Sequence, residues 1–121
     1  MSLNPTVSDC LFCRIVAVEI PADVVTQTDR VLAFRDIVPL APVHVLVVPK
    51  QHYEDAAELA AAGEGLTDEL VSVAAEVAAG QGIVDSGYRL VFNTGPDAGR
   101  TVFHAHLHLL GGSRLHAIGV A

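Results

Sequence analysis

Three histidines near the C-terminus recur at every second position, at His104, His106 and His108. Imidazole is close to neutral at physiological pH, so one ring can attack an electrophile while a neighbouring ring donates a proton. In a β-strand alternate side chains point to the same side, which would place the three rings on one face. The opposite face would then be apolar and carry Phe103, Ala105, Leu107 and Leu109. The pattern predicts a strand with one core face and one chemical face.

Two other interpretations of this run remain open. A solvent-facing strand surface can carry histidines without a function, and two histidines at i and i+2 of a strand can bind one metal ion. His104 and His108 would be separated by about 13 Å along a regular strand, so a single centre with all three histidines as ligands is disfavoured.

The loop before the histidines has the composition of an anion-binding turn. Gly95 and Gly99 would let backbone N–H groups approach a phosphate, and Asn93 and Thr101 could add side-chain hydrogen bonds. Alone, such a loop is most often a simple turn between strands. Its place directly before the histidines favours phosphate binding.

The strands that must position these residues follow from hydrophobic spacing. Residues 24–28 and 31–34 predict a hairpin, and residues 44–48, bracketed by prolines, predict a central strand buried on both faces. Residues 88–93 and 102–110 predict two further strands. This order suits an antiparallel sheet with a helix packed on it, an α+β fold.

Two helices are expected. Leu66, Leu70, Val73 and Val77 recur at steps of four, three and four, which predicts one long helix with Thr67 as a possible cap, ending at Gly80 and Gly82. Asp9 can cap a shorter helical turn that runs through Leu11, Phe12, Ile15 and Val16.

Size and charge narrow the class of protein. A chain of 121 residues is the length of one domain, and its net charge of −7 comes without any run of Lys or Arg, so nucleic acid is not an expected partner. No segment has the length and apolarity of a membrane span, and the N-terminus lacks a signal-peptide pattern. We expect a cytoplasmic protein with no membrane partner.

Cys10 and Cys13 form a Cys-x-x-Cys pair, which in the cytosol suggests metal ligation or redox work.

Five motifs in order resemble the histidine-triad (HIT) nucleotide-binding superfamily, close to its Hint-like branch. They are Leu32-Ala-Phe-Arg-Asp-Ile37, Pro39-x-Ala-Pro-x-His44, Leu46-Val-Val-Pro-Lys50, Asn93-x-Gly-x-Asp-x-Gly99 and the His-x-His-x-His run. The resemblance implies a HIT-like fold with a five-stranded antiparallel sheet, one long helix and a short N-terminal helix. We expect the domain at residues 10–116, a flexible lead at 1–9 and a short tail at 117–121.

The resemblance also implies a reaction. His106 would attack the α-phosphate of a purine nucleoside 5′-phosphoramidate or a similar nucleotidyl conjugate, and water would hydrolyse the resulting nucleotidyl-histidine. His108 and His44 would orient the phosphate, and His104 would fix its neighbours. A non-catalytic nucleotide-binding module, a small zinc protein and a dinucleoside polyphosphate hydrolase remain alternatives; the last is disfavoured because His108 stands where its usual signature has glutamine.

Nucleotide-binding residues are implied in the same way. Asp36 would bind the ribose, and the base pocket would be made by Phe12, Ile15, Phe34 and Ile37, although Phe34 also suits ordinary core. Asn93, Gly99, Arg100 and Thr101 would contact the phosphate region. Arg100 and Thr101 stand where the Hint branch usually has glutamine and serine, so substrate preference is expected to differ.

Some bacterial members resemble this chain in pairing Cys-x-x-Cys with two histidines around structural zinc. Here the ligands would be Cys10, Cys13, His52 and His104; two buried thiols and an unrelated surface histidine are the alternative. No cofactor is implied for catalysis. A homodimer is implied as well.

Overall fold

The computed structural model of the protein describes residues 9–99 and 102–117. Its centre is one antiparallel sheet with the strand order β1-β2-β3-β5-β4. The strands are β1 (Val24–Gln27), β2 (Val31–Arg35), β3 (Val43–Pro49), β4 (Tyr88–Phe92) and β5 (Leu107–Gly111). The predicted α+β class and five-stranded antiparallel sheet are confirmed. β3 is the central strand and is buried along its whole length, as its apolar run predicted.

The described residues also form three α-helices and one short 3-10 helix: α1 (Leu11–Val16) before the first strand, α2 (Ala56–Ala62) and α3 (Leu66–Gly80) between β3 and β4, and η1 (Pro96–Ala98) between β4 and β5. α3 is the predicted long helix, and its spaced residues Leu66, Leu70, Val73 and Val77 are all buried. α2 was not expected as a separate helix. Among the described residues no helix is long and apolar enough to span a bilayer.

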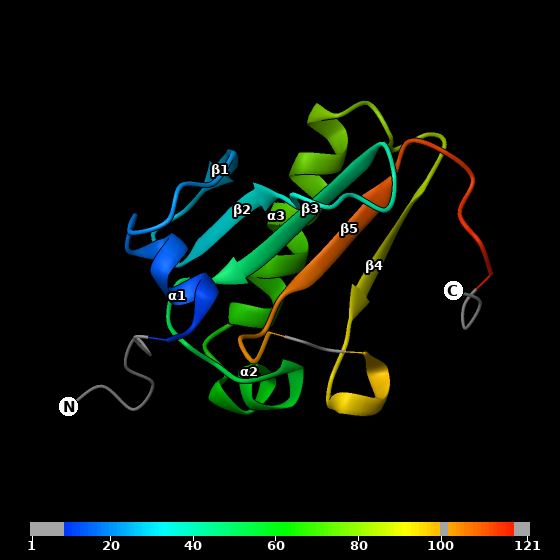
Figure 1. Cartoon of the computed structure of the whole chain (residues 1–121). Helices are drawn as coiled ribbons and strands as arrows, with labels where there is room; N and C mark the ends of the chain where they lie inside the picture. The colour runs from blue at the N-terminus through cyan, green and yellow to red at the C-terminus, as the bar shows by residue number, and fades with distance from the viewer. Residues whose placement is uncertain (1–8, 100–101, 118–121) are drawn as a thin grey trace.

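The two faces of the sheet carry different layers (Figure 1). On one face, alternate residues of the inner strands pack beneath α3 in the larger core, among them Val45 and Val47 of β3 and Leu107 and Leu109 of β5. On the other face, Leu46 and Val48 of β3 pack with Leu32 and Phe34 of β2 against Phe12 of α1. The period-two alternation of side chains therefore separates a helix-covered core from the face that holds α1.

β5 is shorter than predicted. It begins at Leu107, so His104 and His106 precede the strand instead of lying in it. The register that pairs Val47 with Leu107 would bring Pro49 opposite Ala105, but proline has no N–H to donate. The Pro49 carbonyl instead accepts from the His104 ring, and the N–H of Ala105 donates to the carbonyl of Tyr53. The ladder ends there because both partners bond elsewhere.

Three local expectations were wrong. Phe103 was expected on the core face, yet it is 53% exposed because the chain leaves the strand conformation there. The side chain that caps α1 is Cys10, whose Sγ accepts from the Cys13 N–H, and not Asp9. The N-cap of α3 is Gly65, and the hydroxyl of Thr67 is buried without a hydrogen-bond partner among the described residues.

Candidate active site

Three of the four predicted catalytic histidines come together on the face that holds α1. His44 lies on β3 and His108 on β5, where the register pairs Leu46 with His108 and so makes His44 a diagonal neighbour. Nε2 of His44 lies 2.9 Å from Nδ1 of His108. The rings of His106 and His108 contact each other with centroids 4.9 Å apart. His44, His106 and His108 therefore form one cluster.

Main-chain groups determine where the protons lie on these rings. The N–H of Leu40 donates to Nδ1 of His44 over 3.1 Å, so neutral His44 carries its proton on Nε2. The Nε2–H group of His44 donates to Nδ1 of His108, so neutral His108 carries its own proton on Nε2. Nε2 of His108 is thus a hydrogen-bond donor.

His106 has the opposite arrangement. Its Nδ1 lies 2.7 Å from the backbone carbonyl of His104, and because a carbonyl only accepts, Nδ1 carries the proton. Nε2 of neutral His106 therefore holds a lone pair. The cluster places a nucleophilic nitrogen on His106 next to a donor on His108.

Burial favours the neutral forms of His44 and His108. Desolvation, with a smaller contribution from the neighbouring rings of His106 and His44, lowers the pKa of His108 to about 4, although the Asp36 carboxylate opposes the shift. Desolvation also lowers the pKa of His44, although the Asp36 carboxylate, whose Oδ2 lies 3.5 Å from Nε2 of His44, opposes that shift. At neutral pH both rings are uncharged, as the proton assignment requires.

A pocket of about 290 Å³ opens beside this cluster. His106 and His108 lie at its wall, and the predicted base-pocket residues Phe12, Ile15 and Phe34 line it together with Ile37. Phe34 also belongs to the smaller core, where its ring meets that of Phe12 edge-on at 5.6 Å, so it serves both purposes. The pocket is lined mainly by apolar side chains with two imidazoles among them, as is common in small-molecule sites.

The predicted ribose-binding acid lies at the pocket wall. Asp36 follows β2 directly, and its Oδ1 accepts from the N–H of Val38 over 2.9 Å. Its side chain is 22% exposed, so lone pairs remain accessible to a ligand. Ile37, beside it, is 93% exposed and forms part of the rim. Asp36 therefore accepts a bond within the turn after β2 and lines the pocket as well.

The expected phosphate loop is only partly described. Gly99 follows η1 with a left-handed φ of 83°, a conformation that glycine adopts at no steric cost. Neither Gly99 nor Asn93 is among the described residues that line the pocket. Arg100 and Thr101 lie outside the described residues.

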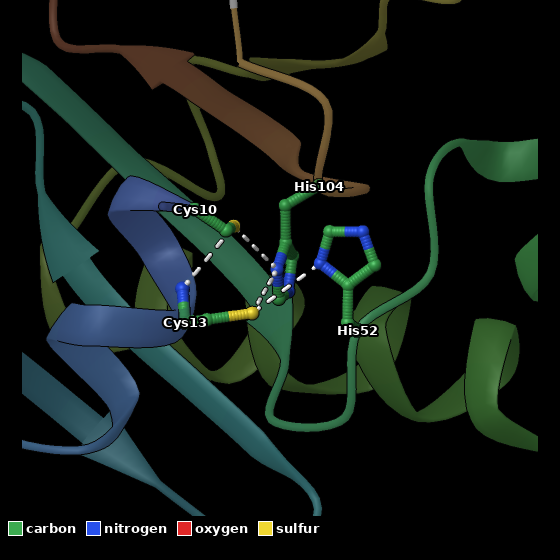
Figure 2. A group of neighbouring side chains, drawn as sticks. All are labelled: Cys10, Cys13, His52 and His104. Atoms are coloured by element: carbon green, nitrogen blue, oxygen red, sulfur yellow. Dashed lines mark hydrogen bonds between the residues drawn. The ribbon is translucent and has the colours of Figure 1, made fainter. Parts of the chain in front are cut away.

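His104 belongs to a second cluster, with Cys10, Cys13 and His52 (Figure 2). Nδ1 of His104 lies 3.4 Å from Cys10 Sγ and 3.5 Å from Cys13 Sγ, and Nδ1 of His52 lies 3.3 Å from Cys13 Sγ. In a tetrahedral zinc site with Zn–S of about 2.3 Å and Zn–N near 2.0 Å, sulfur and nitrogen ligands are separated by about 3.5 Å. These three distances are close to this separation, and the ligand atoms of all four predicted metal ligands lie within 4.8 Å of one another.

The proton arrangement of His104 also fits a metal. Its Nε2 lies 2.8 Å from the Pro49 carbonyl and so carries the proton, which leaves the lone pair of Nδ1 directed at the two sulfurs. Burial lowers the pKa of His104 to about 4, although the bond to Pro49 opposes the shift, so the ring is neutral as a ligand must be. Two thiolates and two neutral imidazoles are a donor set that zinc prefers.

Asp36, His44 and His108 also lie close enough together to be considered as metal ligands. Here, however, the facing nitrogens of His44 and His108 already share a proton at 2.9 Å. Their arrangement is that of a hydrogen-bond chain.

Several residues at the site were not predicted. Leu11, Ile20, Pro21, Ala22, Arg35, Leu46 and Val102 also line the pocket. Leu46 could have been found from its alternation with His44 along the central strand. The main-chain groups of Leu40, Pro49 and His104 that set the histidine protons leave no signal in residue type.

Comparison with known proteins identifies the family. The family model described as HIT domain matches residues 17–115. An uncharacterised HIT-like protein of Synechococcus elongatus is 48% identical over 107 residues, which are 88% of this chain and 93% of that protein. The purine nucleoside phosphoramidase of Escherichia coli K12 is 42% identical over 107 residues, covering 88% of this chain and 90% of the enzyme.

Solved structures give the same result. A HIT family hydrolase from Clostridium thermocellum superposes with a TM-score of 0.90 at 40% sequence identity, covering 95% of this chain and all 100% of that one. A histidine triad protein from Clostridium difficile gives 0.87 at 39% identity, with 92% and 96% of the two chains covered.

Proposed function

The chain belongs to the HIT domain family, and on this premise we propose that it hydrolyses purine nucleoside 5′-phosphoramidates or similar nucleotidyl conjugates. The observation that carries the proposal is the 2.7 Å contact between Nδ1 of His106 and the His104 carbonyl, which places the ring proton on Nδ1 and the nucleophilic lone pair on Nε2. The similar E. coli protein, named a purine nucleoside phosphoramidase, supports this class of substrate.

The first half of the reaction forms a nucleotidyl-histidine. The nucleotide base and ribose occupy the pocket between α1 and Asp36, and the α-phosphate lies against His106 and His108. Because a bound phosphate is anionic, it favours uptake of one proton by the His44–His108 pair. Nε2 of His106 attacks phosphorus, the P–N bond to the amine breaks, and the departing nitrogen takes that proton from Nε2 of His108.

The second half returns the enzyme to its starting state. A water oxygen attacks phosphorus and gives one proton to the His44–His108 pair, while the bond between phosphorus and Nε2 of His106 breaks. The products are the amine and the nucleoside 5′-monophosphate. The histidine pair gains in this half the proton that it lost in the first, so the cycle is balanced.

We propose that the second cluster binds structural zinc through Cys10, Cys13, His52 and His104. Four protein ligands complete a tetrahedral shell and leave no open position for substrate, which is the property of a structural site. When bound, the metal supplies a cross-link between α1 and the segment that precedes β5.

The test uses an adenosine 5′-phosphoramidate as substrate. AMP release is measured with the wild type and with His106→Ala, and samples quenched early are analysed by intact mass for a nucleotidyl adduct. His116→Ala is the matched control, because this exposed histidine lies outside both clusters and its backbone carbonyl, which the substitution keeps, accepts from Arg89. We expect turnover and an adduct in wild type and control, and neither in His106→Ala. AMP binding without turnover would instead favour a nucleotide-binding module.

A further inference from the structure

Helix α1 contributes to both clusters at once. Cys10 caps it and Cys13 lies within it, while Phe12 and Ile15 of the same helix line the nucleotide pocket. α1 has six residues, far fewer than the roughly 12–15 that an isolated helix needs to be even marginally stable in water. Its position therefore depends on what holds it to the sheet.

The metal cluster is one such attachment. Figure 2 shows the two cysteines approaching from α1, while His52 lies just after β3 and His104 just before β5. His104 is itself fixed to the end of β3 through the Pro49 carbonyl. A metal held by these four side chains would tie one wall of the pocket to the centre of the sheet.

A second connection runs from the cluster to the nucleophile. The same residue that offers a ring nitrogen to the metal, His104, accepts the Nδ1 proton of His106 at its carbonyl. The ring of Phe12 meets both residues edge-on, with centroids 5.9 Å from His104 and 5.1 Å from His106. A shift of His104 or α1 therefore changes the surroundings of His106 directly.

We propose that metal binding at Cys10, Cys13, His52 and His104 is thermodynamically coupled to nucleotide binding in the pocket, with the four ligands acting as positioning residues. The metal fixes α1 and the His104 carbonyl, so the metal-loaded chain binds the nucleotide more tightly than the metal-free chain. By linkage, bound nucleotide raises the affinity for the metal by the same factor, which we expect to be about tenfold. This inference rests on the proposed function only in placing a nucleotide in the pocket.

The primary test measures both sides of the linkage on the full chain. AMP affinity is measured by calorimetry with zinc-saturated and with chelator-treated protein, and circular dichroism checks that both remain folded. Zinc affinity is then measured by competition with a chromophoric chelator, with and without saturating AMP. Two equal factors of about tenfold support the coupling. AMP affinities within twofold of each other in folded samples overturn it, as does a zinc affinity that AMP leaves unchanged.

A variant of one metal-binding residue provides a second test if the metal-free chain unfolds. His52→Asn keeps both cysteines and His104, so α1 retains its ligands while zinc affinity falls. Its AMP affinity should be weak at low zinc and return to the wild-type value at saturating zinc. Failure to recover in a folded, zinc-loaded variant contradicts the proposal. If AMP binding is zinc-dependent while no phosphoramidate is hydrolysed, the proposed function fails and the coupling stands.

Discussion

His44 and His108 lie on neighbouring strands, and Nε2 of the first donates to Nδ1 of the second over 2.9 Å. This single bond decides which nitrogen of His108 faces the pocket with a proton. Since Nδ1 of His44 is already occupied by the N–H of Leu40, the direction of the bond cannot be reversed while both rings are neutral.

Replacing His44 should therefore impair chemistry more than binding. His44→Phe keeps a ring beside His108 but removes the donor, so His108 can place its proton on either nitrogen. We expect kcat for an adenosine phosphoramidate to fall roughly 100-fold, as for loss of an aligned proton donor. The dissociation constant of AMP, measured by calorimetry, should change less than threefold. A large loss of AMP affinity with unchanged kcat would refute this role.

Asp36 should determine ribose recognition. In Asp36→Asn the turn bond to the Val38 N–H can persist, but the amide replaces the charged acceptor. Hydrogen bonds to a charged group contribute about 1.5–3 kcal/mol, so AMP affinity should fall at least roughly tenfold. The decisive comparison is with 2′,3′-dideoxy-AMP, which wild type should bind more weakly than AMP and the variant should bind about equally. Retention of the full wild-type preference by the variant would place the ribose elsewhere.

Stability should fall with acid between neutral pH and pH 4. Burial lowers the pKa of His108 from 6.5 to about 4, so within this window the unfolded chain binds a proton that the folded chain does not. The free energy of unfolding then decreases as pH falls, by up to about 1.4 kcal/mol per pH unit for one such group. Urea denaturation at pH 7 and pH 5 should show a smaller decrease in His108→Asn than in wild type. Equal decreases would mean that His108 titrates alike in the folded and unfolded chains.

An unfavourable backbone conformation follows the end of α1. Val18 is 85% exposed and has a left-handed φ of 62°, in a turn closed by bonds from the N–H of Val18 to Ile15 and of Glu19 to Arg14. A β-branched residue is strained there, and glycine is the usual occupant of this position. Val18→Gly should raise the free energy of unfolding by about 0.5–1 kcal/mol. This value is the backbone strain that is relieved, less the cost of the greater entropy of glycine in the unfolded chain.

The matched control for this change is Val84→Gly. Val84 is also an exposed valine in a turn but is not among the residues with positive φ. There the substitution should be destabilising, because only the entropic effect remains. Chemical denaturation of both variants compares them directly, and a loss of stability in Val18→Gly would show that its backbone is not strained.

Elements with regular apolar spacing were predictable from the sequence. The spaced leucines and valines of α3 lie on one face only in a helix, and that face is buried. The continuous apolar run of β3 has the length of a strand and is buried throughout. The grouping of His44 with His106 and His108, and of His104 with the two cysteines, was also anticipated through the family resemblance.

The features that were not predicted from the sequence depend on contacts between segments far apart in the chain. β5 begins at Leu107 because Pro49, far away in the chain, cannot extend the ladder, and Phe103 is exposed for the same reason. Thr67 has the residue type of a cap, but the cap position of α3 is taken by Gly65 with its left-handed φ, and the Thr67 hydroxyl lies buried inside the first turn of the helix. Local residue type predicts a preference, and tertiary packing overrides it at these positions.

The groups that assign protons in this site belong to the main chain. The Leu40 N–H, the His104 carbonyl and the Pro49 carbonyl set the tautomers of His44, His106 and His104, respectively. Mutation can replace the side chains at Leu40 and Pro49, or those lining the pocket, without deleting any of these three groups. Substrate preference can therefore evolve on this scaffold by ordinary substitutions of the pocket wall while the acid–base pattern of the reaction is inherited unchanged.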